Sequence, residues 1–255
     1  MLRELAEKTL IVIGTHRSPA FVDLQMRMLE RTNSTASLCP VLVYDDAPQD
    51  QDTDNVFTYR NFLADQRHTL KHGLGLGHSP GDRMVFAEGL RRASELGCTY
   101  MVKLSRRWIW TDPGWLDKAL QRLEASGHHT LSHACSTTGF GFRTECCALR
   151  VEPWIENADL IEEEATYIPH VLVESYMHHM AADITTRKMT TRLMEHVRRN
   201  PKSRDFEHWP EMGHGRGWSH VGRIWHEADR PVVYANLAMA IGGCRYTSEF
   251  DYKVV

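Results

Sequence analysis

Acidic and polar side chains follow two apolar runs of this 255-residue chain. Asp45 and Asp46 stand after PVLVY, and Thr15, His16 and Arg17 end the run that starts with TLIVIG. A carboxylate at the end of a strand accepts hydrogen bonds from a uracil or guanine N–H, or from ribose hydroxyls. We therefore interpret Asp45 and Asp46 as candidate ligand contacts, with Thr15, His16 and Arg17 beside them. The alternative for the two aspartates is a turn or a helix cap.

The elements that must position these residues alternate along the first half of the chain. TLIVIG, PVLVYDD and TYMVKL predict buried strands, and helical patterns cover residues 18–30, residues 82–96 and a segment opened by Pro113. This order predicts an α/β fold with a mostly parallel, twisted sheet and helices on both faces. Ligands bind at the carboxyl ends of such strands, so Thr15–Arg17, Asp45–Asp46 and Ser105–Arg107 are expected at one edge.

Composition restricts the class of protein. The net charge is −3, which gives no overall field to attract nucleic acid. The apolar runs are too short to span a bilayer, and the N-terminus lacks the pattern of a secretory signal. Six scattered cysteines without a C-x-x-C pair indicate reduced, mostly buried thiols. We therefore expect a cytoplasmic protein.

The second half has a less regular pattern. HTLSHACS and FRTECCALRV predict strands, in a hairpin around Gly139 and Gly141, and residues 171–199 predict a helix. The segment 200–217 is rich in Pro, Gly, His and charge, which is typical of a loop. We expect a single domain, with residues 1–130 as a nucleotide-binding half and residues 131–255 as an acceptor-binding half with a C-terminal lid.

One long stretch carries a resemblance. GLGLGHSPGDRMVFAEGLRRASELGCTYMVKLSRRW has a glycine-containing loop, a helix with the patch AEGL, and an apolar strand. It resembles the corresponding part of family-2-like GT-A glycosyltransferases, which have an A-N-x-G-like patch and a strand ending in Asp-x-Asp. The resemblance covers roughly residues 9–120. It implies a GT-A-like, Rossmann-like fold and a nucleotide-sugar donor, such as a UDP- or GDP-sugar, held by Thr15–Arg17 and Asp45–Asp46.

The sequence departs from the family at the metal motif. Ser105-Arg106-Arg107 stands in place of Asp-x-Asp, and Lys103 precedes it by two residues. Carboxylates there hold Mg²⁺ or Mn²⁺, whereas these cations repel a divalent metal. Lys103, Arg106 and Arg107 are therefore expected to bind the diphosphate directly, without a metal or other cofactor. An eroded, inactive homologue and a solvated basic turn are the alternatives.

The same resemblance suggests the remaining site residues. An inverting transfer needs a carboxylate base, and Glu174 in VLVESY is the candidate, with Glu145 in FRTECC as its rival. His226 in IWHE matches a late histidine that joins the phosphate site in GT-A relatives. Histidine spacing gives no zinc motif. The acceptor, whether glycan, lipid or small molecule, is not identified by the sequence.

Two further functions stay open. One is a catalytically silent GT-A-like domain that binds a glycan or a protein. The other is a methyltransferase that uses the glycine-rich stretch for S-adenosylmethionine. Nucleotide affinity separates the three, because only the glycosyltransferase is expected to bind UDP or GDP.

Overall fold

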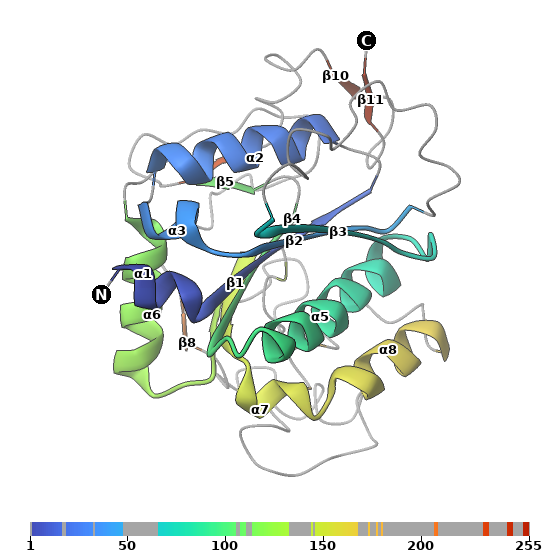
Figure 1. Cartoon of the computed structure of the whole chain (residues 1–255). Helices are drawn as coiled ribbons and strands as arrows, with labels where there is room; N and C mark the ends of the chain where they lie inside the picture. Colours follow the sequence, from blue (N-terminus) through green and yellow to red (C-terminus); the bar gives the residue numbers. More distant parts are fainter. Residues whose placement is uncertain are drawn as a thin grey trace.

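The structure is a computed structural model of the whole chain (Figure 1). It describes residues 2–16, 19–32, 34–47, 66–105, 108–110, 114–132, 144, 146–167, 173, 177, 180, 207–208, 232–234, 244–246 and 252–254.

A seven-stranded sheet forms the centre, in the order β3-β2-β1-β4-β7-β6-β8. Its strands are β1 (Thr9–Thr15), β2 (Val41–Asp45), β3 (His68–His72), β4 (Tyr100–Ser105), β6 (Thr130–Ser132), β7 (Cys146–Arg150) and β8 (Glu207–His208). The four strands β3, β2, β1 and β4 are mutually parallel. β7 runs antiparallel to both of its neighbours, β4 and β6. The sheet is therefore mostly parallel, as the sequence predicts, and three later strands, β6, β7 and β8, complete it.

One face of the sheet is covered by α1 (Leu2–Glu7), α2 (Pro19–Thr32), α3 (Ser34–Leu38) and α6 (Trp115–Ser126). Alternate residues of the central strands, such as Ile11, Ile13 and Val43, pack there against Leu120 of α6. The predicted apolar stripe of α6 is fully buried in this core. We call this side the α2 face (Figure 1).

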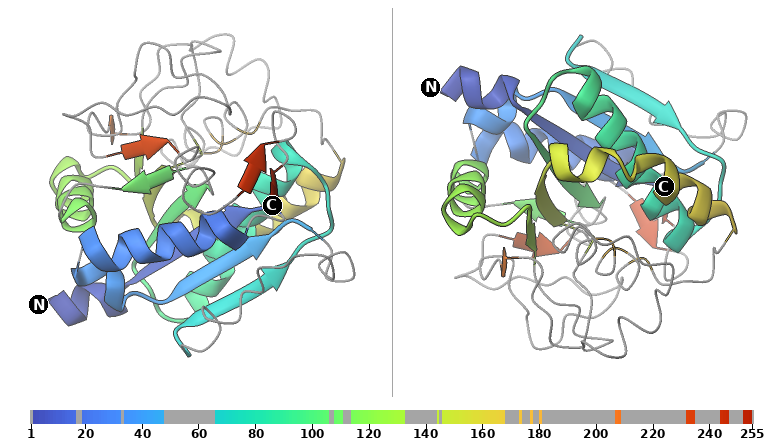
Figure 2. Two further views of the ribbon diagram at one scale, coloured as in Figure 1. Left: turned by 90° about the horizontal axis from the view of Figure 1, so that it is seen from above. Right: turned by 90° about the horizontal axis from the view of Figure 1, so that it is seen from below.

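The other face is covered by α5 (His78–Glu95), α7 (Glu152–Ile155) and α8 (Ala158–Tyr167), as the two views in Figure 2 show. The intervening strand residues Leu10, Val12 and Tyr44 pack there against Phe86 of α5 and Trp154 of α7. We call this side the α5 face. Helices on both faces confirm the predicted α/β architecture.

Helix α5 lies very close to the sheet. A Cβ added to Gly89 would lie 2.7 Å from the Met101 sulfur and 2.9 Å from a methyl carbon of Val12. The helix begins at His78, one turn before the predicted start at residue 82. Pro80 is tolerated there because the first turn of a helix needs no N–H at that position.

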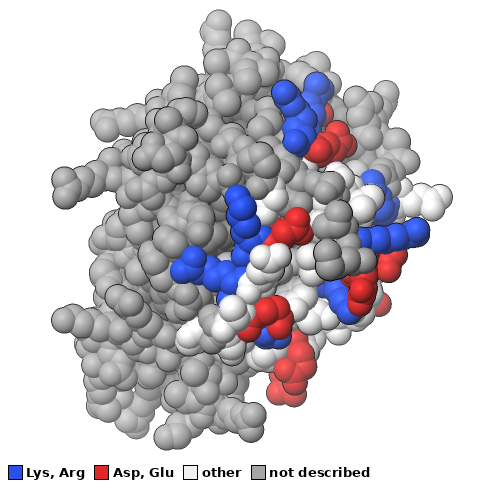
Figure 3. All heavy atoms as spheres, turned by 90° about the vertical axis from the view of Figure 1, so that its left-hand side faces the viewer, with Lys and Arg blue, Asp and Glu red and all other residues white. Residues whose placement is uncertain are grey.

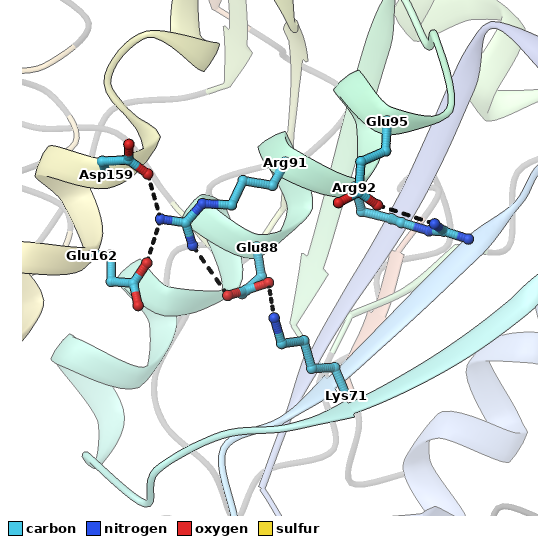
Figure 4. Close-up of polar contacts among 7 residues, drawn as sticks. All are labelled: Lys71, Glu88, Arg91, Arg92, Glu95, Asp159 and Glu162. Carbon is cyan, nitrogen blue, oxygen red and sulfur yellow. Dashed lines mark hydrogen bonds and ion pairs between the residues drawn. The ribbon is translucent and has the colours of Figure 1, made fainter.

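An ion-pair network joins α5 to β3 and α8 (Figure 4). Glu88 accepts hydrogen bonds from Lys71 of β3 and, at 3.2 Å, from Arg91. Arg91 also pairs with Asp159, at 2.7 Å, and with Glu162. Glu88, in the patch that resembles A-N-x-G, therefore serves to join these elements.

Two short strand pairs lie outside the seven-stranded sheet. β5 (Trp108–Trp110) pairs antiparallel with β9 (Val232–Tyr234), and β10 (Cys244–Tyr246) pairs with β11 (Tyr252–Val254). Most of the predicted helix at residues 171–199 and the predicted loop at 200–217 lie outside the described residues. Among the helices that the structure describes, none has the length and hydrophobicity to cross a membrane.

Candidate functional site

The carboxyl ends of the parallel strands form one edge of the sheet, and three polar residues lie side by side along it. In the strand register, Thr15 at the end of β1 stands opposite Asp45 of β2, and Asp45 stands opposite His72 of β3. Side chains at paired positions project to the same face of a sheet. Because Ile13 and Val43, two residues earlier, pack on the α2 face, Thr15 and Asp45 share that face.

Thr15 is buried, with 6% of its surface exposed, and its hydroxyl oxygen has no hydrogen-bond partner among the described residues. Leaving a buried hydroxyl unpaired costs about 1–3 kcal/mol, so such groups are usually paired. Asp45 beside it is fully buried, and its Oδ1 accepts a hydrogen bond from the Ala47 N–H at 3.1 Å. The edge therefore offers a hydroxyl and a carboxylate next to each other.

The segment between β3 and α5, residues 73–77, is here called the glycine loop. Residues 45 and 46 hold it through the backbone, because the Gly73 and Gly75 N–H groups donate to the carbonyl oxygens of Asp45 and Asp46. The Asp46 carboxylate holds it as well. Its Oδ1 accepts from the Leu76 N–H at 3.3 Å, and its Oδ2 accepts from the Gly77 N–H at 3.0 Å.

Asp46 therefore lies on the α5 face, against the first turn of α5. A Cβ added to Gly81 would lie 2.7 Å from the Asp46 carboxylate, which explains the glycine there. Burial raises the pKa of Asp46 to about 6, although the two N–H donors oppose the rise, and the negative charges of Asp45 and Asp82 add to it.

Lys103, predicted to bind a diphosphate, lies inside the α5 face. Its side chain is 0% exposed, and its ammonium pairs with Asp82 of α5 and donates to the Thr144 carbonyl oxygen at 2.7 Å. The same ammonium lies 5.1 Å from the centre of the Phe86 ring. The sheet thus separates Lys103 from Thr15 and Asp45.

The end of β4 is held by α2. The Gln25 amide of α2 donates a hydrogen bond to the Ser105 carbonyl oxygen at 2.7 Å. Ser105 is the last residue of β4 and stands opposite Gly14 of β1 in the strand register. Arg106 and Arg107, directly after Ser105, lie outside the described residues. β5 begins at residue 108 and pairs with β9, so a strand of the C-terminal segment lies beside the chain that leaves this edge.

Five predicted site residues fall on or next to the edge or within the α5 face: Thr15, His16, Asp45, Asp46 and Lys103. His16 is partly buried directly after β1. The other predicted site residues lie outside the described residues, so their roles stay predictions. They are Arg17, Arg106, Arg107, Glu145, Glu174 and His226.

Sequence reasoning missed the partners of these residues. The Lys103–Asp82 pair had a usable signal, because a lysine flanked by Val102 and Leu104 in a buried strand needs a carboxylate partner. The contact of Asp46 with the glycine loop had no such signal in the sequence, since nothing in the sequence shows whether Asp45 or Asp46 lies against α5.

The described carboxylates near the edge do not fit a divalent metal of the kind that Asp-x-Asp holds. Both oxygens of Asp46 accept N–H groups, and Asp82 pairs with Lys103. β4 ends in Ser105 instead of an aspartate. The described residues contain no group of three or more histidine, cysteine, aspartate or glutamate side chains that could hold a metal ion.

The opposite end of the sheet carries a hollow of about 530 Å³. Its lining residues are Arg3, Ala6, Glu7, Leu38, Pro40, Arg67 and Leu96. The described surface on this side of the molecule shows basic and acidic side chains interspersed (Figure 3). Arg3 pairs with Glu7 at 3.1 Å. Because ligands of parallel sheets bind at the carboxyl ends, this hollow is not the candidate site.

No protein-family model matches the chain, and no curated protein matches it in sequence. Among solved structures, it is similar to a mannosyltransferase from Pyrobaculum calidifontis in complex with GDP-Man and Mn²⁺. The TM-score is 0.47 and the identity 14%, over 71% of this chain and 52% of that one. A glycosyltransferase from Streptococcus pneumoniae matches at a TM-score of 0.43 and 14% identity, over 80% and 45%.

A cytidylyltransferase from Leptospira borgpetersenii matches at a TM-score of 0.43 and 14% identity, over 80% of this chain and 76% of that one. The chain spans about half the length of the two glycosyltransferases. The likeness is one of fold, to GT-A-like nucleotide-sugar glycosyltransferases and nucleotidyltransferases.

Proposed function

We propose that this chain transfers a sugar from a nucleotide-diphosphate donor, a UDP- or GDP-sugar, to an acceptor hydroxyl. The donor nucleotide binds at the carboxyl edge of β1 and β2. One observation carries this proposal: the buried hydroxyl of Thr15, which has no hydrogen-bond partner among the described residues, stands beside the Asp45 carboxylate in the strand register. A hydroxyl and a carboxylate suit the N–H of a base or the hydroxyls of a ribose.

The chemistry requires two further groups. The acceptor oxygen bonds to the anomeric carbon, the bond to the diphosphate oxygen breaks, and a base takes the acceptor proton. Glu174 or Glu145 is the proposed base. Arg106 and Arg107 are the proposed diphosphate ligands, which stabilise the leaving group without a metal. Lys103 is not included among these ligands, because its buried ammonium already pairs with Asp82 and donates to the Thr144 carbonyl oxygen.

Thermal unfolding with nucleotides tests the proposal. UDP, GDP, UDP-glucose and GDP-mannose are each added with Mn²⁺ and with EDTA. A bound ligand at 100 times its Kd adds about 2.7 kcal/mol and raises the Tm by several degrees. We expect one of these nucleotides to raise the Tm equally in both conditions. No shift with any of them, at any metal concentration, would overturn the proposal.

Two threonines of β1 give a matched pair of variants. Thr15→Val removes the unpartnered hydroxyl, so we expect about tenfold weaker nucleotide binding with no loss of stability. Thr9 is also buried, but its hydroxyl donates to the Leu5 carbonyl oxygen at 2.8 Å. Thr9→Val should therefore lower stability by about 1 kcal/mol and leave nucleotide affinity unchanged. Equal affinities of the two variants would contradict the role of Thr15.

A second function, a GT-A-like domain without catalysis that binds a glycan or a protein, is favoured by one observation. The polar groups on the α5 face, Lys103, Asp82 and Asp46, all have internal partners. A domain that no longer binds a nucleotide-sugar would keep these internal ion pairs and hydrogen bonds only because they stabilise the fold. Failure of every nucleotide to stabilise the chain, together with binding to glycans, would support this function.

A further inference from the structure

The glycine loop is held in place by one buried carboxylate. Asp46 is 5% exposed, and its two oxygens accept the N–H groups of consecutive residues, Leu76 and Gly77. Gly77 has a φ of +89° and a ψ of −175°, a conformation that is essentially restricted to glycine. The backbone at residues 76–77 therefore presents its N–H groups to the carboxylate at the expense of an unusual conformation.

The loop adjoins the proposed donor site. It leaves the sheet after His72, whose register partner is Asp45, and the next position along the edge is Thr15. His72 also contacts the Ala47 carbonyl oxygen at 3.2 Å. The conformation of the loop is thus set by the same segment, residues 45–47, that supplies the proposed nucleotide contact.

Resting on the proposed function, we propose that Asp46 is a positioning residue: it contacts no donor atom, but its carboxylate fixes the glycine loop in the shape that the donor site requires, and protonation of that carboxylate releases the loop. The reason is geometric. A protonated carboxyl keeps one good acceptor oxygen, while the other carries a hydrogen that points at a second N–H donor.

The surroundings favour release in the weakly acidic range. The elements packed around Asp46 carry further ionisable side chains: Tyr44 and Asp45 of β2, His68, Lys71 and His72 of β3, and His78, Asp82, Arg83 and Glu88 of α5. Among these, Asp45 and Asp82 act on the Asp46 carboxylate through their charge. The charge of Asp82 is largely balanced by Lys103. Burial and the two neighbouring carboxylates raise the pKa of Asp46 to about 6. The loop is therefore held at neutral pH and released below about pH 6.

The wild-type protein tests the contact directly. In ¹⁵N-labelled full-length protein, the amide protons of Leu76 and Gly77 are followed between pH 5 and 8. We expect both to shift with one midpoint near pH 6, and their protection from hydrogen exchange to fall about tenfold on Asp46→Asn. Glu95→Gln, at the exposed end of α5, is the control and should change neither amide. Amides of the loop that show no titration would overturn the inference.

A second measurement links the contact to the donor. UDP-glucose and GDP-mannose serve as probes, since their diphosphates lack the terminal phosphate ionisation near pH 6 that UDP and GDP have. If binding requires ionised Asp46, the Kd of the bound probe rises about tenfold from pH 7.5 to pH 5. Asp46→Asn should bind weakly at both pH values. Gly77→Ala, which strains the loop while keeping the carboxylate, should also weaken binding.

The outcomes separate the two proposals. Loop amides that titrate in a protein that binds neither probe would overturn the proposed function and keep the contact of Asp46 with the loop. A probe that binds equally well at pH 5 and 7.5, or equally well to Asp46→Asn, would overturn the positioning role and keep the proposed function.

Discussion

At the scale of single residues, the Lys103–Asp82 pair is the most enclosed charge pair among the described residues. The Lys103 side chain is 0% exposed and that of Asp82 is 13% exposed. Two buried charges stabilise each other but lose their hydration, so the pair adds little net stability. Loss of only one partner is different, because it leaves an uncompensated charge in the core.

A double-mutant cycle tests this. Lys103→Met leaves the Asp82 carboxylate without its ammonium and should lower the free energy of unfolding by about 3–5 kcal/mol. Lys103→Met combined with Asp82→Asn should lower it by less than Lys103→Met alone. Lys71→Met is the control, since Lys71 is half-exposed in its pair with Glu88 and should cost about 1 kcal/mol or less. Urea unfolding measures these variants together with Asp82→Asn alone, and strictly additive effects of the two substitutions would contradict the coupling.

Asp46 makes stability depend on pH in an unusual direction. Its pKa is about 6 in the folded state against 3.8 ordinarily, so between pH 4 and 6 the folded protein binds this proton more tightly than the unfolded chain. Raising the pH through this range therefore lowers the contribution of Asp46 to stability, by about 3 kcal/mol in all. Most folded carboxylates do the reverse.

The predicted effect is a difference between wild type and Asp46→Asn in how the unfolding free energy depends on pH. Wild type should lose about 2–2.5 kcal/mol of unfolding free energy from pH 4 to pH 7 relative to Asp46→Asn. At pH 7 the variant escapes the cost of the buried charge but leaves one N–H of the loop poorly paired, which costs about 1–3 kcal/mol. It should therefore fold with near wild-type stability. Parallel pH profiles from urea titrations would contradict the shifted pKa.

At the scale of elements, the arginine pair on α5 gives the sharpest comparison. Arg91 reaches the buried Glu88 and two acids of α8, whereas the adjacent Arg92 pairs with exposed Glu95 on the same helix (Figure 4). Arg91→Met should lower the free energy of unfolding by about 1–2 kcal/mol, and Arg92→Met by less than about 0.5 kcal/mol. Equal losses in chemical unfolding would show that the network joins α5 to α8 with no measurable energy.

The elements that sequence reasoning found are those with strong apolar patterns. β1, β2 and β4 lie where their apolar runs predict, because almost every position of these central parallel strands is buried. α6 lies where its apolar stripe predicts, since that stripe is buried in the core. β3 was missed, since its sequence HTLKH at the sheet edge is half-exposed and polar. α8 was missed as well: it is ADLIEEEATY, whose buried positions are only Ala158, Ile161 and Ala165.

The candidate site, too, could be predicted only in part from the sequence. The edge itself, with Thr15 next to Asp45, was predictable because parallel strands end at one edge. The prediction did not take into account on which face of the sheet each side chain lies. Alternation along β4 places Lys103 with Met101 on the α5 face. The prediction that Lys103 binds the diphosphate therefore concerns a residue on the opposite face of the sheet from Thr15 and Asp45.

At the scale of the whole molecule, the sheet is shared by two cores. Along β1, Ile11 and Ile13 belong to the α2-face core, whereas Leu10 and Val12 belong to the α5-face core. If the central strands separate on one face of the sheet, the apolar residues of the core on the other face are exposed as well. The described part of the molecule should therefore unfold as one cooperative unit.

Two buried tryptophans allow this to be followed on each face separately. Trp115 lies in the α2-face core and Trp154 in the α5-face core. In protein labelled with 5-fluorotryptophan, with the two resonances assigned by Trp→Phe variants, both signals should vanish at the same urea concentration. Leu120→Ala on one face and Phe86→Ala on the other should each lower stability by about 2–5 kcal/mol and move both resonances together. Their effects should also add, because the sheet separates the two sites. A variant that lowers the midpoint of only the tryptophan on its own face would mean that the strands do not couple the two cores, and the edge between Thr15 and Asp45 would then lack a rigid support.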